Sequence, residues 1–332
     1  MTETLKDRIE NGRAPLRSVS DTSSSSASAL GIDLPVERPV AKPDRSLTMP
    51  GATEPGGRWG PLRETTAKAV RRPLFVLTVL FIAFVGVSAF FPSWFTSYDP
   101  YRTAPADRLL APSTTHLFGT DEMGRDLWTR TLYGSTLTIE AALIALAIAV
   151  VAGLTLGVIS GFFSGVTDSV IMRFVDVLLA IPGLLLALAI VTALGFGTVP
   201  VAIAVGIGIV PGFARTTRAE VLRVKTLPYV EAARAGGASW TRVLLRHILP
   251  NSWGPVAVLA VLDFGVAIIA IAALSFLGFG AAPPQAEWGT LVSTGRNFLV
   301  TAPWVSLMPG LFIAITVLSL NHISKTLQEL ER

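Results

Sequence analysis

The sequence predicts an all-α, polytopic membrane protein with six transmembrane helices and a disordered N-terminal tail. Of its 332 residues, 51% are hydrophobic and 15% are charged, whereas soluble domains are about 25% charged. The apolar residues gather into six long stretches, and a helix needs about 20 such residues to cross a bilayer. The chain contains no cysteine, so disulfides and thiolate metal sites are excluded.

Residues 1–70 are predicted to be a disordered cytoplasmic extension, distinct from a transmembrane domain at 71–332. The extension carries a serine run at Ser23–Ser26, scattered prolines and interspersed charges. Such a segment cannot bury enough apolar surface to offset the entropy lost on ordering. Its first thirty residues lack the apolar core of a signal peptide.

The six apolar stretches are expected to span the membrane at about 73–91, 138–162, 170–194, 199–213, 255–279 and 305–323. Pro182 and Pro211 fall inside spans, where a kink is tolerated if neighbouring groups satisfy the freed carbonyls.

The second stretch carries glycines at a repeated spacing of four, at Gly153, Gly157, Gly161 and Gly165. This spacing is typical of a groove where another helix approaches closely. The alternative is that membrane helices are simply rich in glycine.

The basic residues of the loops predict the orientation. The loop at about 214–252 holds seven lysines and arginines against two acids, whereas the loop between the fifth and sixth stretches holds one arginine and one acid. The positive-inside rule places the former in the cytoplasm. With six spans, both termini are then cytoplasmic and the loop at 93–137 lies outside.

The polar stretch EAARAGGASWTRVLLRHILPN, from Glu231 to Asn251, retains helical periodicity. A first helix is expected to break at Gly236-Gly237, and a second begins at Ser239 and ends at Pro250. The second helix carries one apolar side, formed by Trp240, Val243, Leu244, His247 and Ile248. An interfacial amphipathic helix would show the same pattern. The small residues between the two helices instead favour entry into a protein groove.

These residues resemble a known motif. Glu231-Ala-Ala, with Gly237 six positions later and Leu249-Pro250 beyond, is similar to the EAA coupling loop of ABC-importer permeases. The segments YVEAARAGGAS and RHILPN resemble the dipeptide/oligopeptide branch of that family, as do HLFGTDEMGRDLWTRTLYG, DSVIMRFVDVLLAIPGLLLALAIV, PGFARTTRAEVL and AALSFLGFGAAPPQAEWG. The resemblance covers roughly residues 70–310.

The resemblance implies a type I ABC-importer permease in the bacterial inner membrane that imports di- or oligopeptides, with nickel- or glutathione-like cargo left open. It implies a heterodimer with a homologous permease, two ATPase subunits that hold ATP and Mg, and an extracytoplasmic peptide-binding protein. The lipid bilayer surrounds the chain, and no nucleic acid partner is expected. The implied ATPase-coupling residues are Glu231, Ala232, Ala233, Gly237, Ala238 and Arg242.

No catalytic site is predicted in this chain. It contains no GxxxxGK[ST] phosphate loop, so ATP hydrolysis is assigned to the partner subunits. Asp121, Glu122 and Asp126 in the outer loop do not follow the EF-hand spacing. No metal site is therefore predicted, and the segment is expected to be a structured outer loop that meets the binding protein.

Two acids at membrane depth are candidates for the translocation pathway, because ionisable groups there usually face a bundle interior or water. Asp176 has Arg173 three residues away, so an intrahelical ion pair is the alternative. Asp263 has no basic residue within four positions.

Two rival classes of function were considered. A proton-coupled secondary transporter would use Asp176 and Asp263 as proton relays, but the two halves show no convincing repeat and six spans are few for such a carrier. An intramembrane hydrolase needs a nucleophile–base pair or an HExxH motif at membrane depth, and the sequence shows neither.

Overall fold

The structure, a computed structural model, describes residues 73–331, in which the regular elements are helices apart from one isolated β-bridge between Thr120 and Asp126. The predicted disordered extension lies outside the described residues. The α-helices are α2 (Pro73–Phe90), α3 (Leu127–Phe163), α4 (Gly165–Ala180), α5 (Gly183–Leu194), α6 (Thr198–Lys225), α7 (Pro228–Ala235), α8 (Trp240–Val243), α9 (Leu249–Asn251), α10 (Trp253–Phe276), α11 (Trp288–Gly295) and α12 (Trp304–Glu331). Short 3-10 turns lie at Pro92–Trp94, Pro105–Asp107 and Arg296–Phe298, and a π-helical turn lies at Leu244–Ile248.

The prediction of six spans is confirmed with one correction. Within the described residues, α2, α3, α6, α10 and α12 are long and apolar enough to cross a membrane, and α4 with α5 makes a sixth span that bends by 93°. The third stretch was expected to be one span with a kink tolerated at Pro182, but the helix breaks there, and Ile181 before the proline is extended. Proline disfavours the α conformation at the residue before it, so the helix ends there.

Two helices extend well beyond their apolar stretches. α3 begins at Leu127 rather than near residue 138, because Asp126 caps it: its carboxylate accepts the Thr129 amide at 2.8 Å. α6 continues to Lys225 rather than ending near residue 213, and its polar last turns are held by neighbouring helices. Hydrophobicity alone therefore underestimates the length of both.

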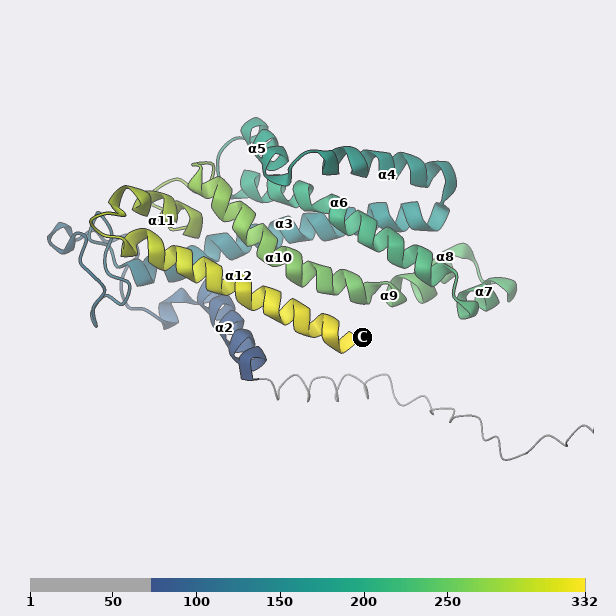
Figure 1. Cartoon of the computed structure of the whole chain (residues 1–332), viewed down its shortest axis with the longest axis horizontal. Helices are drawn as coiled ribbons and strands as arrows, with labels where there is room; N and C mark the ends of the chain where they lie inside the picture. Colours follow the sequence, from purple (N-terminus) through teal and green to yellow (C-terminus); the bar gives the residue numbers. More distant parts are fainter. Residues whose placement is uncertain (1–72, 332) are drawn as a thin grey trace, which may run out of the picture. The chain divides into compact units, whose positions relative to one another are not determined.

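The glycine groove on α3 is confirmed at three of its four positions, and it packs against α6, which runs beside α3 in Figure 1. A β-carbon at Gly157 would lie 2.6 Å from the carbonyl oxygen of Ala214, and Gly153 and Gly161 approach α6 as closely. Gly165 is the exception, because it is the first residue of α4, with a φ of +66° and open space around it.

The short helix α11 packs into the bundle through a fully buried tryptophan. The Trp288 indole nitrogen donates to the Thr131 carbonyl at 2.9 Å, and its ring meets Phe312 of α12 edge to face at 5.3 Å. These contacts fix α11 against α3 and α12 on the opposite side of the bundle from α7 and α8 (Figure 1).

Candidate functional site

The segment from Glu231 to Asn251 contains a tight, glycine-closed turn. α7 ends at Ala235, and the amide of Gly237 donates to the Arg234 carbonyl at 3.0 Å while the amide of Ala238 donates to the Ala233 carbonyl at 3.1 Å. This pair of bonds is a Schellman motif, which places a left-handed residue after the helix. Gly237 is that residue, with a φ of +81°. The predicted break at Gly236-Gly237 is confirmed.

The second half of the segment begins as predicted but does not end as predicted. The Ser239 hydroxyl accepts the Arg242 amide at 3.4 Å and caps α8. The chain was expected to stop being helical at Pro250, yet Pro250 lies inside α9 and α10 follows at once. Proline is tolerated there because the first turn of a helix has no partner for the missing N–H.

The segment is anchored from behind by apolar residues. Val230, Val243 and Ile248 are buried and pack against Val221 and Val224 at the end of α6. The spacing of five between Val243 and Ile248 does not place two residues on one side of an α-helix, but the π-helical turn between them does. The segment is therefore folded onto the bundle.

The tip of the segment, Ala232–Ala238, is largely exposed to solvent. Of the six residues predicted to couple to an ATPase, four are exposed and two are half-buried. The four are Glu231, Ala232, Gly237 and Arg242; the two are Ala233 and Ala238. Neither Glu231 nor Arg242 forms an ion pair within residues 73–331. The tip thus presents backbone and small side chains apart from the exposed Arg234.

The two pathway candidates lie in different settings. The sequence indicated Arg173 as an alternative partner of Asp176. Asp176 pairs instead with Arg215 of α6 at 2.5 Å, and both side chains are more than half exposed. Asp263 lies half-buried in α10 and forms no ion pair in the part of the chain that the structure describes. The structure does not bring the two acids together.

Two contacts that the sequence did not indicate join helices at the end of the bundle that carries α7. Arg218 of α6 holds Asp168 of α4 with two hydrogen bonds of 2.5 and 2.6 Å. The Lys225 ammonium donates to the Phe162 carbonyl at 2.6 Å and to the Ser164 hydroxyl at 3.1 Å. A lysine at this position satisfies the free carbonyls at the end of α3.

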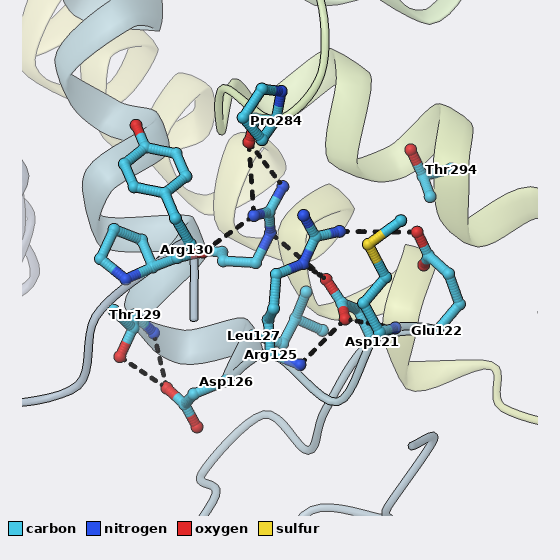
Figure 2. Close-up of polar contacts among 12 residues, drawn as sticks. Asp121, Glu122, Arg125, Asp126, Leu127, Thr129, Arg130, Pro284 and Thr294 are labelled. Atoms are coloured by element: carbon cyan, nitrogen blue, oxygen red, sulfur yellow. Dashed lines mark hydrogen bonds and ion pairs between the residues drawn. The ribbon is translucent and has the colours of Figure 1, made fainter. Parts of the chain in front are cut away.

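The loop before α3 is structured, as predicted, by a network of arginines and acids (Figure 2). The Asp121 carboxylate pairs with Arg125 at 2.7 Å and with Arg130 at 3.4 Å, and Arg125 also reaches Glu122 at 3.5 Å. Arg130 reaches the Pro284 carbonyl in the loop before α11 at 3.5 Å. Asp121 and Glu122 therefore form ion pairs with arginines, and Arg130 joins two loops that are distant in sequence.

Asp126 and Glu287 are buried acids at the starts of helices. Asp126 also accepts a hydrogen bond from His116, at 2.8 Å. Glu287 caps α11 and accepts the amides of Gly289 at 3.1 Å and Thr290 at 3.2 Å. Burial raises the pKa of Glu287 despite these bonds. Neither acid carried a signal in the sequence beyond its place before a helix.

The fold defined by these helices is similar to that of a chain in a solved ABC transporter. A chain of the MetNI methionine ABC transporter, solved in an inward-facing conformation, matches it with a TM-score of 0.51 at 16% identity, covering 61% of this chain and 97% of that chain. The chain belongs to the family described as binding-protein-dependent transport system inner membrane component, whose model matches residues 153–330. Family membership removes the secondary transporter and the intramembrane hydrolase from consideration.

Three relatives match over most of their length. The dipeptide transport system permease protein of Alkalihalophilus pseudofirmus is 39% identical, over 81% of this chain and 88% of the relative. The glutathione transport system permease protein of Pectobacterium atrosepticum is 38% identical, over 81% and 90%. The probable D,D-dipeptide transport system permease protein of Escherichia coli is 40% identical, over 78% and 87%.

Proposed function

We propose that this chain is one permease subunit of an ATP-driven importer of di- and oligopeptides, glutathione-like peptides included. It forms half of the translocation pathway, in a heterodimer with a homologous permease. Two ATPase subunits bind ATP and Mg, and an extracytoplasmic binding protein delivers the peptide. The cargo is supported by the dipeptide and glutathione permeases, which are 38–39% identical to this chain over about nine tenths of their length.

The observation that carries the proposed coupling role is the tip of the segment from Glu231 to Asn251. Its turn is fixed by two backbone hydrogen bonds, its rear is packed on α6, and apart from Arg234 its outer surface consists of small residues. A small, fixed projection allows close backbone approach to a groove on a partner, whereas lipid anchoring calls for bulky apolar residues at the tip.

The contacts behind the tip support transmission of force into the bundle. α7 follows α6 after a turn of two residues, and α6 is joined to α3 through the glycine groove and through Lys225. Well-packed helices move as rigid bodies rather than deforming continuously. A movement of the tip would therefore shift α3 and α6 together.

The proposed orientation places the coupling segment and both termini in the cytoplasm.

Asp263 is the stronger pathway candidate of the two acids, because it is half-buried at mid-helix without an ion-pair partner in the described chain. Asp176 is exposed and already paired with Arg215.

The coupling role is tested by Gly237→Leu, with Gly165→Leu as the matched control. Both glycines have a positive φ and open space around an added β-carbon, so leucine introduces similar backbone strain of about 1–2 kcal/mol at each. Only Gly237 lies at the tip. Peptide uptake and transport-stimulated ATPase activity are expected to fall together in Gly237→Leu and to persist in Gly165→Leu, with both proteins inserted normally.

Two further variants sharpen the test. Asparagine tolerates the left-handed conformation, so Gly237→Asn keeps the turn but still adds a side chain at the tip; it is expected to lower coupling as well. Glu231→Ala should do so more mildly, because it would remove only one exposed ion pair between Glu231 and a basic residue of the ATPase, and such a pair contributes little. Wild-type uptake and ATPase stimulation in a well-inserted Gly237→Leu protein would refute the docking role.

A further inference from the structure

A basic cavity of about 470 Å³ lies between the ends of α3 and α6 and the coupling segment. Lys225 and Arg234 contribute its charges, Phe163 and Trp240 lie on its wall, and none of its lining residues is acidic. Two like charges without a counter-ion in a concave site raise the local concentration of anions.

The two cations play different parts. The Lys225 ammonium donates to the Phe162 carbonyl and the Ser164 hydroxyl, at 2.6 and 3.1 Å, so it offers charge rather than free donors. The Arg234 side chain is exposed and has no hydrogen bond or ion pair within residues 73–331. A free guanidinium fork matches the geometry of a phosphate group.

An apolar stripe lies on α4, the helix that follows Phe163 in the chain. Phe163 on the wall of the cavity is 57% exposed, and after the turn an exposed row follows on α4 at spacings of four, four and three: Val166, Val170, Phe174 and Val177. These spacings place the row on one side of the helix. The exposed apolar row on α4 therefore begins three residues after Phe163, which lines the basic cavity.

We propose that this cavity binds the phosphate headgroup of an anionic phospholipid, whose acyl chains lie along the stripe on α4. A free phosphate ion would fit the charges but would leave the stripe unused, and the carboxylates of a soluble partner would do the same. Basic pockets between membrane helices at the headgroup level are suited to anionic lipids. The site depends on the chain being a membrane permease and is independent of the cargo, and it shares Arg234 and Ala238 with the segment proposed to couple to the ATPase.

The test is lipid binding to the purified full-length chain in detergent, measured by native mass spectrometry during titration with phosphatidylglycerol. Phosphatidylcholine and inorganic phosphate form the comparison arms. The variant Arg234→Gln removes the free guanidinium, and Arg246→Gln removes an exposed arginine of the same segment that does not line the cavity. Val170→Ser interrupts the apolar stripe.

Phosphatidylglycerol is expected to bind the wild-type protein at one saturable site. Its affinity for Arg234→Gln should be lower by about tenfold or more, because a charge-assisted hydrogen bond is lost. Binding should also weaken in Val170→Ser and should be unchanged in Arg246→Gln. Equal binding of phosphatidylcholine would overturn the proposal, as would displacement of the lipid by millimolar inorganic phosphate. Unchanged lipid binding in Arg234→Gln, with loss of co-purified ATPase, would assign Arg234 to the protein partner instead.

Discussion

Replacing Gly157 by alanine is expected to destabilise the permease, although alanine is normally the better helix former. The added β-carbon would lie 2.5 Å from the Thr217 β-carbon, 2.6 Å from the Ala214 carbonyl oxygen and 3.0 Å from the Arg218 amide nitrogen. Two of these three atoms belong to the α6 backbone, so no side-chain rotation relieves the clash. The helices must separate, and contacts along the whole groove weaken.

The magnitude follows from a matched comparison with Gly212→Ala. Gly212 lies within α6, where an added β-carbon meets nothing within 4 Å. Both variants gain the same helix propensity of about 1 kcal/mol, so their difference isolates the packing cost. Overpacking a close interface costs about 1–3 kcal/mol. We therefore expect Gly157→Ala to be less stable than Gly212→Ala by that amount.

The assay is unfolding of the purified full-length variants in mixed micelles, followed by helical circular dichroism as the denaturing detergent fraction rises. Gly157→Ala should unfold at a lower fraction than wild type, and Gly212→Ala at an equal or higher one. Indistinguishable transitions for the two variants would show that α3 and α6 are not in close backbone contact at Gly157.

Three further predictions follow from other parts of the molecule. In intact cells, an impermeant thiol reagent should label Ser113→Cys and not Ser239→Cys; the reverse pattern would refute the proposed orientation. Asp168→Asn should lower the free energy of unfolding by roughly 1 kcal/mol, and Asp176→Asn, which breaks a more exposed ion pair between the same two helices, by less. Burial raises the pKa of Glu287 above its ordinary value of 4.5, so the contribution of Glu287 to the free energy of unfolding is complete below pH 4.5 and is lost as pH rises through the raised pKa. Glu287→Gln should flatten this dependence of stability on pH. An unchanged pH profile in the variant would contradict the prediction.

The sequence predicted those features that depend on local pattern. The glycine spacing on α3 indicated a groove, and three of the four glycines line it. The glycine pair after α7 indicated a helix end, and Ser239 indicated the start of the next helix. Each of these features is fixed by residues within one or two helical turns, where backbone geometry leaves few alternatives.

The sequence did not predict the contacts that join distant segments. Arg130 reaches a carbonyl 154 residues away, and Lys225 caps a helix that ends about sixty residues earlier. A polar side chain in a sequence shows what it can donate or accept but not which groups the fold places beside it. The tip at Gly237 shows a related limit, because its exposure depends on the rear packing of Val230, Val243 and Ile248.

The partner of Asp176 shows how helix packing decides a contact that the local sequence leaves open. On a straight helix from 170 to 194, Arg173 at three residues' distance would be a suitable partner. Instead the helix ends at Ile181 and Pro182, the chain turns by 93° into α5, and α4 is left free to lie against α6. Arg218 then holds Asp168 at the start of α4, and Arg215, one turn earlier on α6, meets Asp176 two turns further along α4. Because the helices run antiparallel, the two ion pairs fix both the register and the direction of α4 on α6. Arg173 remains three residues from Asp176 within α4, so the packing of α4 on α6 determines which arginine Asp176 binds.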